Sequence, residues 1–405
     1  MTTDSQRYHS FDALRAAMMF LGVVIHTACA YSFVPDTWWY YDIHKSPVYD
    51  FVLLFIHVFR LPVFFVMAGF FAALLYQRRG PVAMFKNRTM RVLVPFLVAM
   101  VCLFPLMRFL GAVGWLLRRG RPQVLDGAAR FILSGEFLDG VEPMHLWFLD
   151  LLFVLCILGL VAAPLLPALD GAFRRLMLSR WRVAVLSALT FITLCLMPGG
   201  VLGVLDGFLP DPILLAAYGV FFFFGWLLYR QRDLVATLKQ GAWRKTAAAL
   251  PLAYLNYWAV AKRLPTWTGG DARLQYLTAA TGAVVVWLLV FGLAGLFLRY
   301  ADRPSAKMRW LSDSSYWVYL MHPPLLVVLQ LALSRFAWSA HVKFGIVLLA
   351  AIPILLVSYQ YLVRATFVGA LLNGRRNPIR RSASSEPLPT VTAPMLRTES
   401  NPEPA

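Results

Sequence analysis

Ten apolar runs, each about as long as a bilayer is thick, dominate this chain of 405 residues. A helix rises 1.5 Å per residue, so about 20 residues span the hydrocarbon core. Because that core offers no hydrogen bonds to the backbone, such runs fold as helices. The runs cover residues 11–34, 50–76, 92–114, 144–167, 183–203, 212–229, 246–261, 275–298, 312–333 and 343–363. The sequence therefore predicts an all-α polytopic integral membrane protein with about ten transmembrane helices.

The 38 Lys and Arg residues predict which loops face the cytoplasm. If the N-terminus is inside, the inner loops and tails hold 25 of these residues and the outer loops hold 10. Cytoplasmic loops are enriched in Lys and Arg, so both termini are expected in the cytoplasm. The net charge of +18 lies in short clusters between apolar runs, which favours a lipid surface as partner and argues against nucleic acid.

Residues 1–365 are expected to form one transmembrane domain. Residues 366–405 are rich in Pro, Ser and Arg and predict a disordered cytoplasmic tail whose basic start rests on anionic lipid. The segment Ala28-Cys29-Ala30 imitates a signal-peptide cleavage site, but Arg15 interrupts the apolar core before it. The four cysteines show no metal or redox spacing, so neither a metal site nor a disulfide is expected.

The first span combines an arginine and a histidine in an otherwise apolar stretch. It reads DALRAAMMFLGVVIHT from Asp12 to Thr27. Eleven residues separate Arg15 from His26, which places both on one face of a helix, about 16 Å apart along its axis. Asp12 can pair with Arg15 on that face. A packed histidine is the plain interpretation, and a polar tunnel from the cytoplasm to mid-membrane is the alternative.

Ionisable residues recur at similar depth in three further spans. His57 and Arg60 are three residues apart on one helical face, and His322 lies about ten residues into the ninth span before two prolines. A mid-membrane arginine faces the bundle interior and needs a partner, for which Asp150 in the fourth span is the candidate. His26, His57 and His322 are therefore expected to converge.

The two membrane faces carry different residues. Arg88 and Arg91 precede the third span at the predicted cytoplasmic face, where topology alone explains basic residues and a phosphate clamp with Arg15 is the alternative. On the outer face, Trp38 and Tyr41 belong to an aromatic group, and Glu142, His145 and Trp147 enter the fourth span. An interfacial aromatic belt explains the aromatics, and stacking on a sugar acceptor is the alternative.

These motifs resemble a known family. The Arg-x10-His pattern of DALRAAMMFLGVVIHT, followed in order by FFVMAGFF, FKNRTMRVLVP, EPMHLWFL and SYWVYLMHPPLL, is similar to the acyltransferase-3 family of bacterial membrane O-acyltransferases. Within the family the chain is most similar to the glucan-biosynthesis protein C branch, through IHVFRLPVFFVMAGFF, HLWFLDLLFVL and YLMHPPL. The resemblance extends from residue 8 to about residue 365.

The resemblance implies a multi-pass enzyme of the bacterial inner membrane. It would take an acyl group, succinyl in this branch, from cytoplasmic acyl-CoA and pass it to a sugar hydroxyl of a periplasmic glucan, with no permanently bound cofactor. Arg15, Arg88 and Arg91 would hold the phosphates of the donor. His26 would meet the thioester as general base, or as a covalent acyl carrier.

Further roles follow from the predicted chemistry. Arg60 and His57 would stabilise the oxyanion, or Arg60 would bind the succinyl carboxylate. The outer residues Trp38, Tyr41, Glu142, His145 and Trp147, with His322, are the candidates for binding the acceptor. Two rival functions remain, namely acetyl transfer to lipopolysaccharide or another envelope glycan, and proton-coupled transport, which also uses intramembrane His, Arg and Asp.

Overall fold

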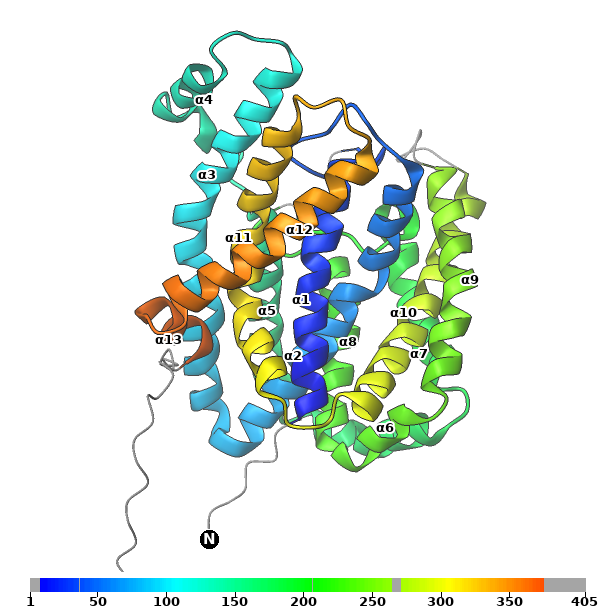
Figure 1. Cartoon of the computed structure of the whole chain (residues 1–405). Helices are drawn as coiled ribbons and strands as arrows, with labels where there is room; N and C mark the ends of the chain where they lie inside the picture. Colours follow the sequence, from blue (N-terminus) through cyan, green and yellow to red (C-terminus); the bar gives the residue numbers. More distant parts are fainter. Residues whose placement is uncertain (1–7, 36, 206, 264–270, 375–405) are drawn as a thin grey trace, which may run out of the picture.

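The computed structural model describes residues 8–35, 37–205, 207–263 and 271–374, and all regular structure there is helical (Figure 1). The long helices are α1 (His9–Cys29), α2 (Pro47–Arg88), α3 (Val94–Arg118), α5 (Trp147–Ala162), α7 (Arg182–Cys195), α8 (Pro212–Arg230), α9 (Ala242–Ala261), α10 (Ala272–Tyr300), α11 (Ala306–Leu333) and α12 (Ala340–Ser358). The short ones are α4 (Val124–Leu133), α6 (Asp170–Leu178) and α13 (Phe367–Asn373). Two π-helical segments, Thr89–Leu93 and Tyr359–Val363, follow α2 and α12.

Every predicted span overlaps one of the long helices, but the spans 11–34 and 183–203 extend beyond the ends of α1 and α7. Within the part of the chain that the structure describes, seven helical stretches are long and apolar enough to cross a membrane, or eight if the bent pair Leu166–Leu178 and Arg182–Cys195 is one span. One of the seven, Pro47–Arg118, contains both α2 and α3, because the chain turns back at Gly80, whose φ of 81° suits glycine (Figure 1). The all-α membrane fold is thus confirmed, and ten crossings stays a prediction.

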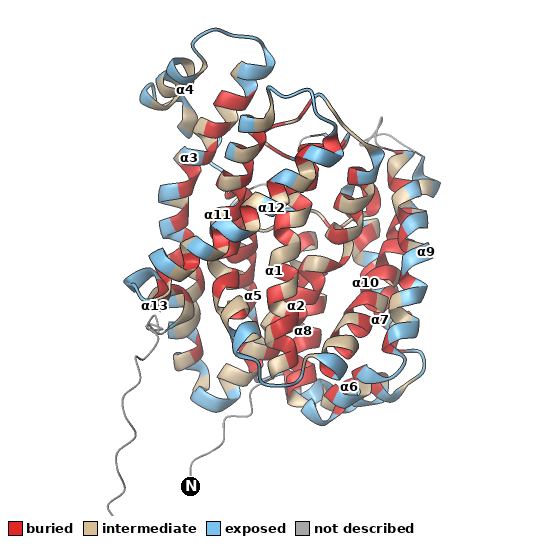
Figure 2. Cartoon of the chain, in the orientation of Figure 1, coloured by how far each residue is buried: buried red, intermediate tan, exposed pale blue. Residues whose placement is uncertain are grey.

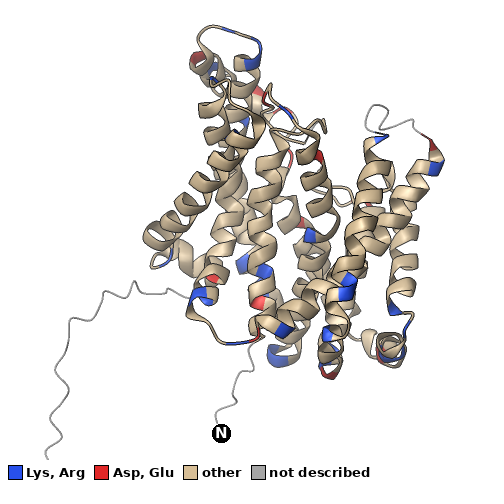
Figure 3. Ribbon diagram, turned by 45° about the vertical axis from the view of Figure 1, so that its right-hand side comes forward, with Lys and Arg blue, Asp and Glu red and all other residues tan. Residues whose placement is uncertain are grey.

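The loops predicted to be cytoplasmic lie together at one end of the bundle. Figure 1 shows the α2–α3 turn, α6 and the α10–α11 loop at the same end as the start of α1, while the α1–α2 loop and the α11–α12 loop lie at the opposite end. Figure 3 shows Lys and Arg mainly near helix ends, with a few inside the bundle. This arrangement agrees with the predicted topology, and the membrane face that each end occupies stays a prediction.

The interior is filled mainly by large aromatic side chains. Trp226, Trp287, Phe65, Phe70 and Phe221 are among the largest fully buried residues. Figure 2 shows buried residues along the facing sides of the helices and exposed residues on their outward sides, as expected for a bundle in lipid. Helix α13 occupies residues 367–373 of the predicted tail, and residues 375–405 lie outside the described residues.

Helices α2 and α8 approach each other at two glycines. A Cβ atom on Gly69 would overlap the carbonyl oxygen of Phe222, and one on Gly225 would overlap the carbonyl oxygen of Val66. Small residues allow such backbone contact between membrane helices, where close packing replaces the hydrophobic effect as the source of affinity. This backbone contact fixes the position of α2, which contains His57 and Arg60.

Replacing Gly225 with leucine is expected to lower the thermal unfolding midpoint of the detergent-purified protein. The added side chain must push α8 away from the α2 backbone, and overpacking of this kind costs about 1–3 kcal/mol. Gly345→Leu on α12 is the matched control, because no atom lies within 4 Å of a Cβ placed there. Equal midpoints for the two variants would contradict the assigned role of the contact.

Candidate active site

An internal cavity of about 80 Å³ lies between α1, α2, α5 and α11. It includes residues from the Met144–Leu146 turn before α5 and from the α7–α8 loop. Its lining residues are Met18, Met19, Ile25, His26, His57, Arg60, Leu61, Phe64, His145, Trp147, Phe148, Val204, Tyr319 and His322. Six predicted site residues from separate parts of the chain thus share one space, namely His26, His57, Arg60, His145, Trp147 and His322. The expected convergence of ionisable side chains is confirmed.

Helices α1 and α11 contact each other through a polar face. At one end, Arg15 donates from Nη2 to Ser312 Oγ at 2.8 Å and pairs with Asp12 Oδ1 at 3.4 Å. Toward the other end, the rings of His26 and His322 lie 5.2 Å apart between centroids. The predicted sharing of one helical face by Arg15 and His26, and the Asp12 pair, are therefore correct.

The proline after His322 determines the orientation of its imidazole. Pro323 has no N–H for the carbonyl of Tyr319, four residues earlier. The ring Nδ1 of His322 lies 2.8 Å from that oxygen and 2.9 Å from the carbonyl oxygen of Val318. Carbonyl oxygens only accept, so Nδ1 holds the proton and Nε2 keeps its lone pair. Nε2 is buried without a hydrogen-bond partner in the part of the chain that the structure describes.

His57 and Arg60 face the cavity from α2. His57 Nε2 donates to the carbonyl oxygen of Leu202 at 2.7 Å, which fixes the α7–α8 loop beside the cavity. Arg60 lies against Gly22 of α1, where a Cβ atom would overlap its guanidinium group. Glycine at position 22 therefore makes room for the arginine. Arg60 makes no hydrogen bond or ion pair with any other described residue.

The expected ion pair between Arg60 and Asp150 is not present within the described part of the chain. Asp150 is not among the cavity residues, and its Oδ2 is buried without a hydrogen-bond partner there. The two residues were paired because of their similar depth. Depth does not determine toward which neighbour a side chain points, because that depends on how α2 and α5 are rotated in the bundle.

The predicted outer residues do not all reach the cavity. Trp38 is buried, and its ring stacks on His26 with centroids 5.0 Å apart and planes at 20°. Tyr41 organises the same loop, since its hydroxyl accepts from the backbone N–H of Thr37 and of Trp38 at 2.6 and 3.0 Å. Glu142 is exposed and is not a lining residue.

The predicted phosphate-binding arginines lie toward the opposite end. Tyr316 donates from its hydroxyl to the carbonyl oxygen of Arg91 at 2.9 Å. Tyr316 is one helical turn from Ser312, the partner of Arg15, so Arg15 and the Arg91 backbone attach to neighbouring turns of α11. Arg88 has a buried Nε without a partner in the described residues. A shared phosphate site stays a prediction.

Three residues of the site were missed by the sequence analysis. Tyr319 lines the cavity and donates from its hydroxyl to the carbonyl oxygen of His145 at 2.8 Å. Its position three residues before His322, on the same helical face, was an available signal. Gly22, opposite Arg60, and Gln330, which holds Trp38, had no such signal because their partners are on other segments. Among the described residues, no group of three or more His, Cys, Asp or Glu side chains is arranged to bind a metal ion.

The structure is therefore that of a helical membrane protein with reactive groups inside its bundle. The helices are apolar, and the cavity between them is lined by imidazoles and one guanidinium group. Comparison with known families specifies the chemistry. A family model described as an acyltransferase domain matches residues 8–360, and the chain belongs to this acyltransferase-3 family. The protein is therefore a membrane acyltransferase.

The chain is also similar to individual proteins of known name. Glucans biosynthesis protein C of Escherichia coli strain K12 is 24% identical over 394 residues, which cover 92% of this chain and 95% of that protein. The protein of the same name from Escherichia coli O81 strain ED1a is 24% identical over 391 residues, with the same two coverages. No solved structure matches the chain.

Proposed function

We propose that the protein transfers a succinyl group from cytoplasmic succinyl-CoA to a sugar hydroxyl of a periplasmic glucan, in the bacterial inner membrane. The observation that carries this proposal is the enclosure of His26, His322 and Arg60 in one cavity of a family acyltransferase. The name of the relatives, Glucans biosynthesis protein C, supports a glucan acceptor.

In the proposed reaction, His26 is the general base. The acceptor hydroxyl oxygen attacks the thioester carbonyl carbon while the neutral imidazole of His26 takes the hydroxyl proton. The tetrahedral intermediate collapses, the C–S bond breaks, and the proton passes from the imidazolium to the leaving thiolate of CoA. His322 Nε2, whose lone pair stays free because Nδ1 bonds two carbonyl oxygens, would accept a hydrogen bond from a neighbouring hydroxyl of the acceptor.

The charge of Arg60 is the reason for proposing an acyl group that carries a free carboxylate. Among the described lining residues Arg60 is the only permanent cation, and none of them is a carboxylate. A buried charge without a counter-ion is costly, so an anion bound beside Arg60 would be stabilised. The free carboxylate of a succinyl group provides that anion. The volume of about 80 Å³ has room for several atoms of water size, which suits a short acyl chain and excludes a sugar ring.

The donor would enter from the end of the bundle that contains Arg15. Eleven residues of α1 separate Arg15 from His26, which is about 16 Å along the helix. A thin pantetheine arm covers that distance between phosphates held by Arg15, Arg88 and Arg91 and a thioester beside His26. Guanidinium groups suit this role because their donors match phosphate oxygens in pairs.

The acceptor would approach from the opposite end, past the α1–α2 loop. Glu142 is exposed there and is available to a sugar, whereas Tyr41 is partly buried, and His145 and Trp147 line the cavity wall. Aromatic and carboxylate groups of this kind bind sugars through stacking and hydrogen bonds.

The test is mass spectrometry of periplasmic glucans from a strain that lacks the gene, with and without a plasmid copy. Loss of succinyl groups, restored by the plasmid, is the expected result. Unchanged glucans together with lost acetyl groups on another envelope glycan would instead favour the second acyltransferase hypothesis. Saturable, ion-coupled flux through the purified protein without any need for acyl-CoA would favour a transporter.

A further inference from the structure

The α1–α2 loop folds back over the end of α1. The backbone N–H of Asp42 donates to the carbonyl oxygen of Ala30 at 2.8 Å, and that of Ser46 donates to Tyr31 at 3.0 Å. These bonds fold residues 30–35 and 37–46 back over His26, which lies one turn before the end of α1. The loop therefore stands between His26 and the predicted outer face.

Trp38 is held on the outer side of His26 by two helices. Its ring stacks on the imidazole, and its Nε1–H donates to Gln330 Oε1 of α11 at 2.6 Å. Gln330 donates in turn to the carbonyl oxygen of Thr27 on α1 at 3.4 Å. Trp38 is only 8% exposed and is not a lining residue of the cavity. It therefore covers the face of the His26 imidazole that points away from the cavity.

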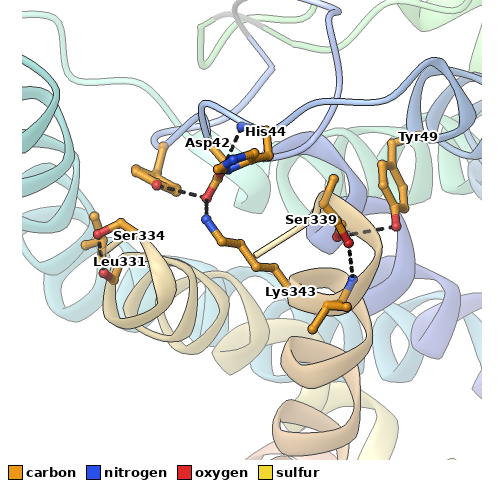
Figure 4. Close-up of polar contacts among 10 residues, drawn as sticks. Asp42, His44, Tyr49, Leu331, Ser334, Ser339 and Lys343 are labelled. Carbon is orange, nitrogen blue, oxygen red and sulfur yellow. Dashed lines mark hydrogen bonds and ion pairs between the residues drawn. The ribbon is translucent and has the colours of Figure 1, made fainter. Parts of the chain in front are cut away.

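A buried ion pair attaches the same loop to α12 (Figure 4). Lys343 Nζ lies 2.7 Å from Asp42 Oδ2, and the two side chains are 0% and 1% exposed. Asp42 also accepts from the Tyr40 hydroxyl at 3.2 Å and from the backbone N–H of His44 at 2.8 Å. No other hydrogen bond or ion pair holds the Lys343 ammonium group among the residues described.

We propose that Trp38 is a positioning residue for His26, and that the Asp42–Lys343 ion pair holds its loop closed over the cavity. This inference rests on the proposed function in one respect, namely that a sugar hydroxyl must reach His26 from the outer side. In the closed loop Trp38 blocks that route. The loop has to open for the acceptor to enter, and it has to bring Trp38 back onto His26 before the proton is taken. The closed loop keeps water away from the thioester.

The energetics of a buried ion pair suit such a closure. Removing one partner leaves an uncompensated charge in the interior, which is strongly destabilising, whereas replacing both partners with neutral groups is often harmless. Asp42→Asn or Lys343→Met should therefore favour the open loop. The double variant Asp42→Asn/Lys343→Met should return it toward the closed state.

Native Cys29 reports loop opening without any need for catalysis. It ends α1 beneath the loop and is 3% exposed. In a background with Cys102→Ser and Cys195→Ser, a membrane-impermeant maleimide should alkylate Cys29 at least about tenfold faster in each single variant, since one lost partner of a buried pair costs more than the 1.4 kcal/mol of a tenfold change. The double variant should react at nearly the wild-type rate. Equal rates in all four proteins would overturn the closure.

Hydrolysis of the donor gives the functional measure. With succinyl-CoA and no acceptor, the purified single variants should release CoA faster than wild type, and the double variant should not. The matched control is Arg230→Met, which breaks the Arg230–Asp170 ion pair at the opposite end of the bundle. It should leave both Cys29 alkylation and CoA release unchanged. A rise in this control equal to that in the single variants would overturn the assignment to the loop.

The positioning role of Trp38 is tested by two substitutions. Trp38→Phe keeps a ring on His26 but loses the bond to Gln330, and Trp38→Ala loses both. The kcat for transfer should fall from wild type to Phe to Ala, with the KM for succinyl-CoA unchanged. Equal kcat values per folded molecule would overturn this role. If wild type transfers no acyl group while Cys29 responds as expected, the proposed function fails and loop closure stands.

Discussion

Replacing His26 with alanine is expected to reduce acyl transfer by about 10²–10⁴-fold, the usual contribution of a general base. The imidazole of His26 lies in the cavity beside His322. Its helix, α1, also contains Arg15, which is proposed to bind the donor phosphates. The measurement is transfer of the acyl group from succinyl-CoA to purified glucan, per molecule of protein that remains monodisperse in detergent.

The matched control for this variant is His341→Ala. His341 lies on α12, contacts the hydroxyl of Tyr49 at 3.0 Å and is not a cavity residue. It should retain transfer. Full activity of the His26→Ala protein would refute both the base and the covalent acyl-carrier roles of His26.

Replacing Arg60 with glutamine is expected to remove the preference for a donor with a free carboxylate. Losing one partner of a buried charge pair costs about 2–5 kcal/mol, which corresponds to about 30- to several-thousand-fold in transfer from succinyl-CoA. Transfer from acetyl-CoA should change far less, because that donor has no carboxylate to bind. Arg60→Lys keeps the charge but loses the paired donors of the guanidinium group. Its rate of transfer from succinyl-CoA should lie between those of wild type and Arg60→Gln.

Comparing the two donors separates the two roles predicted for Arg60. An oxyanion-stabilising arginine would slow both donors by the same factor, and that result would contradict the carboxylate site. Arg108→Gln is the control, since Arg108 also lies in a predicted span but donates to the carbonyl oxygen of Asp139 at 3.1 Å, away from the cavity. Its activity should equal that of wild type.

Much of the site was accessible from sequence because its elements are regular helices. His57 and Arg60 share a face at a spacing of three, and both line the cavity. The expectation that intramembrane ionisable residues face the interior also held for His26 and His322, because lipid cannot solvate them. The pairing of Arg60 with Asp150 failed, since that step required knowledge of contacts between helices.

For the outer residues, too, the sequence predicted the kind of side chain but not its contacts. The aromatic composition of the first outer loop predicted an interfacial belt or a sugar platform, but the structure turns Trp38 inward onto His26. Its partner Gln330 on α11 is 292 residues away in sequence, and Lys343 of α12, which pairs with Asp42 of the same loop, is 301 residues from that aspartate. No local pattern contains that information, because composition does not specify which way a loop folds.

The sequence by itself determined the membrane helices, their expected direction and which residues share a face of each helix. These properties are local, since they follow from run length, charge near each run and the rise and rotation per residue. Only the tertiary structure decided that Arg60 has no acidic partner among the described residues, that Pro323 directs the ring of His322, and that Trp38 closes over His26. Those features depend on how distant helices rotate and pack against each other, and that is a property of the whole bundle.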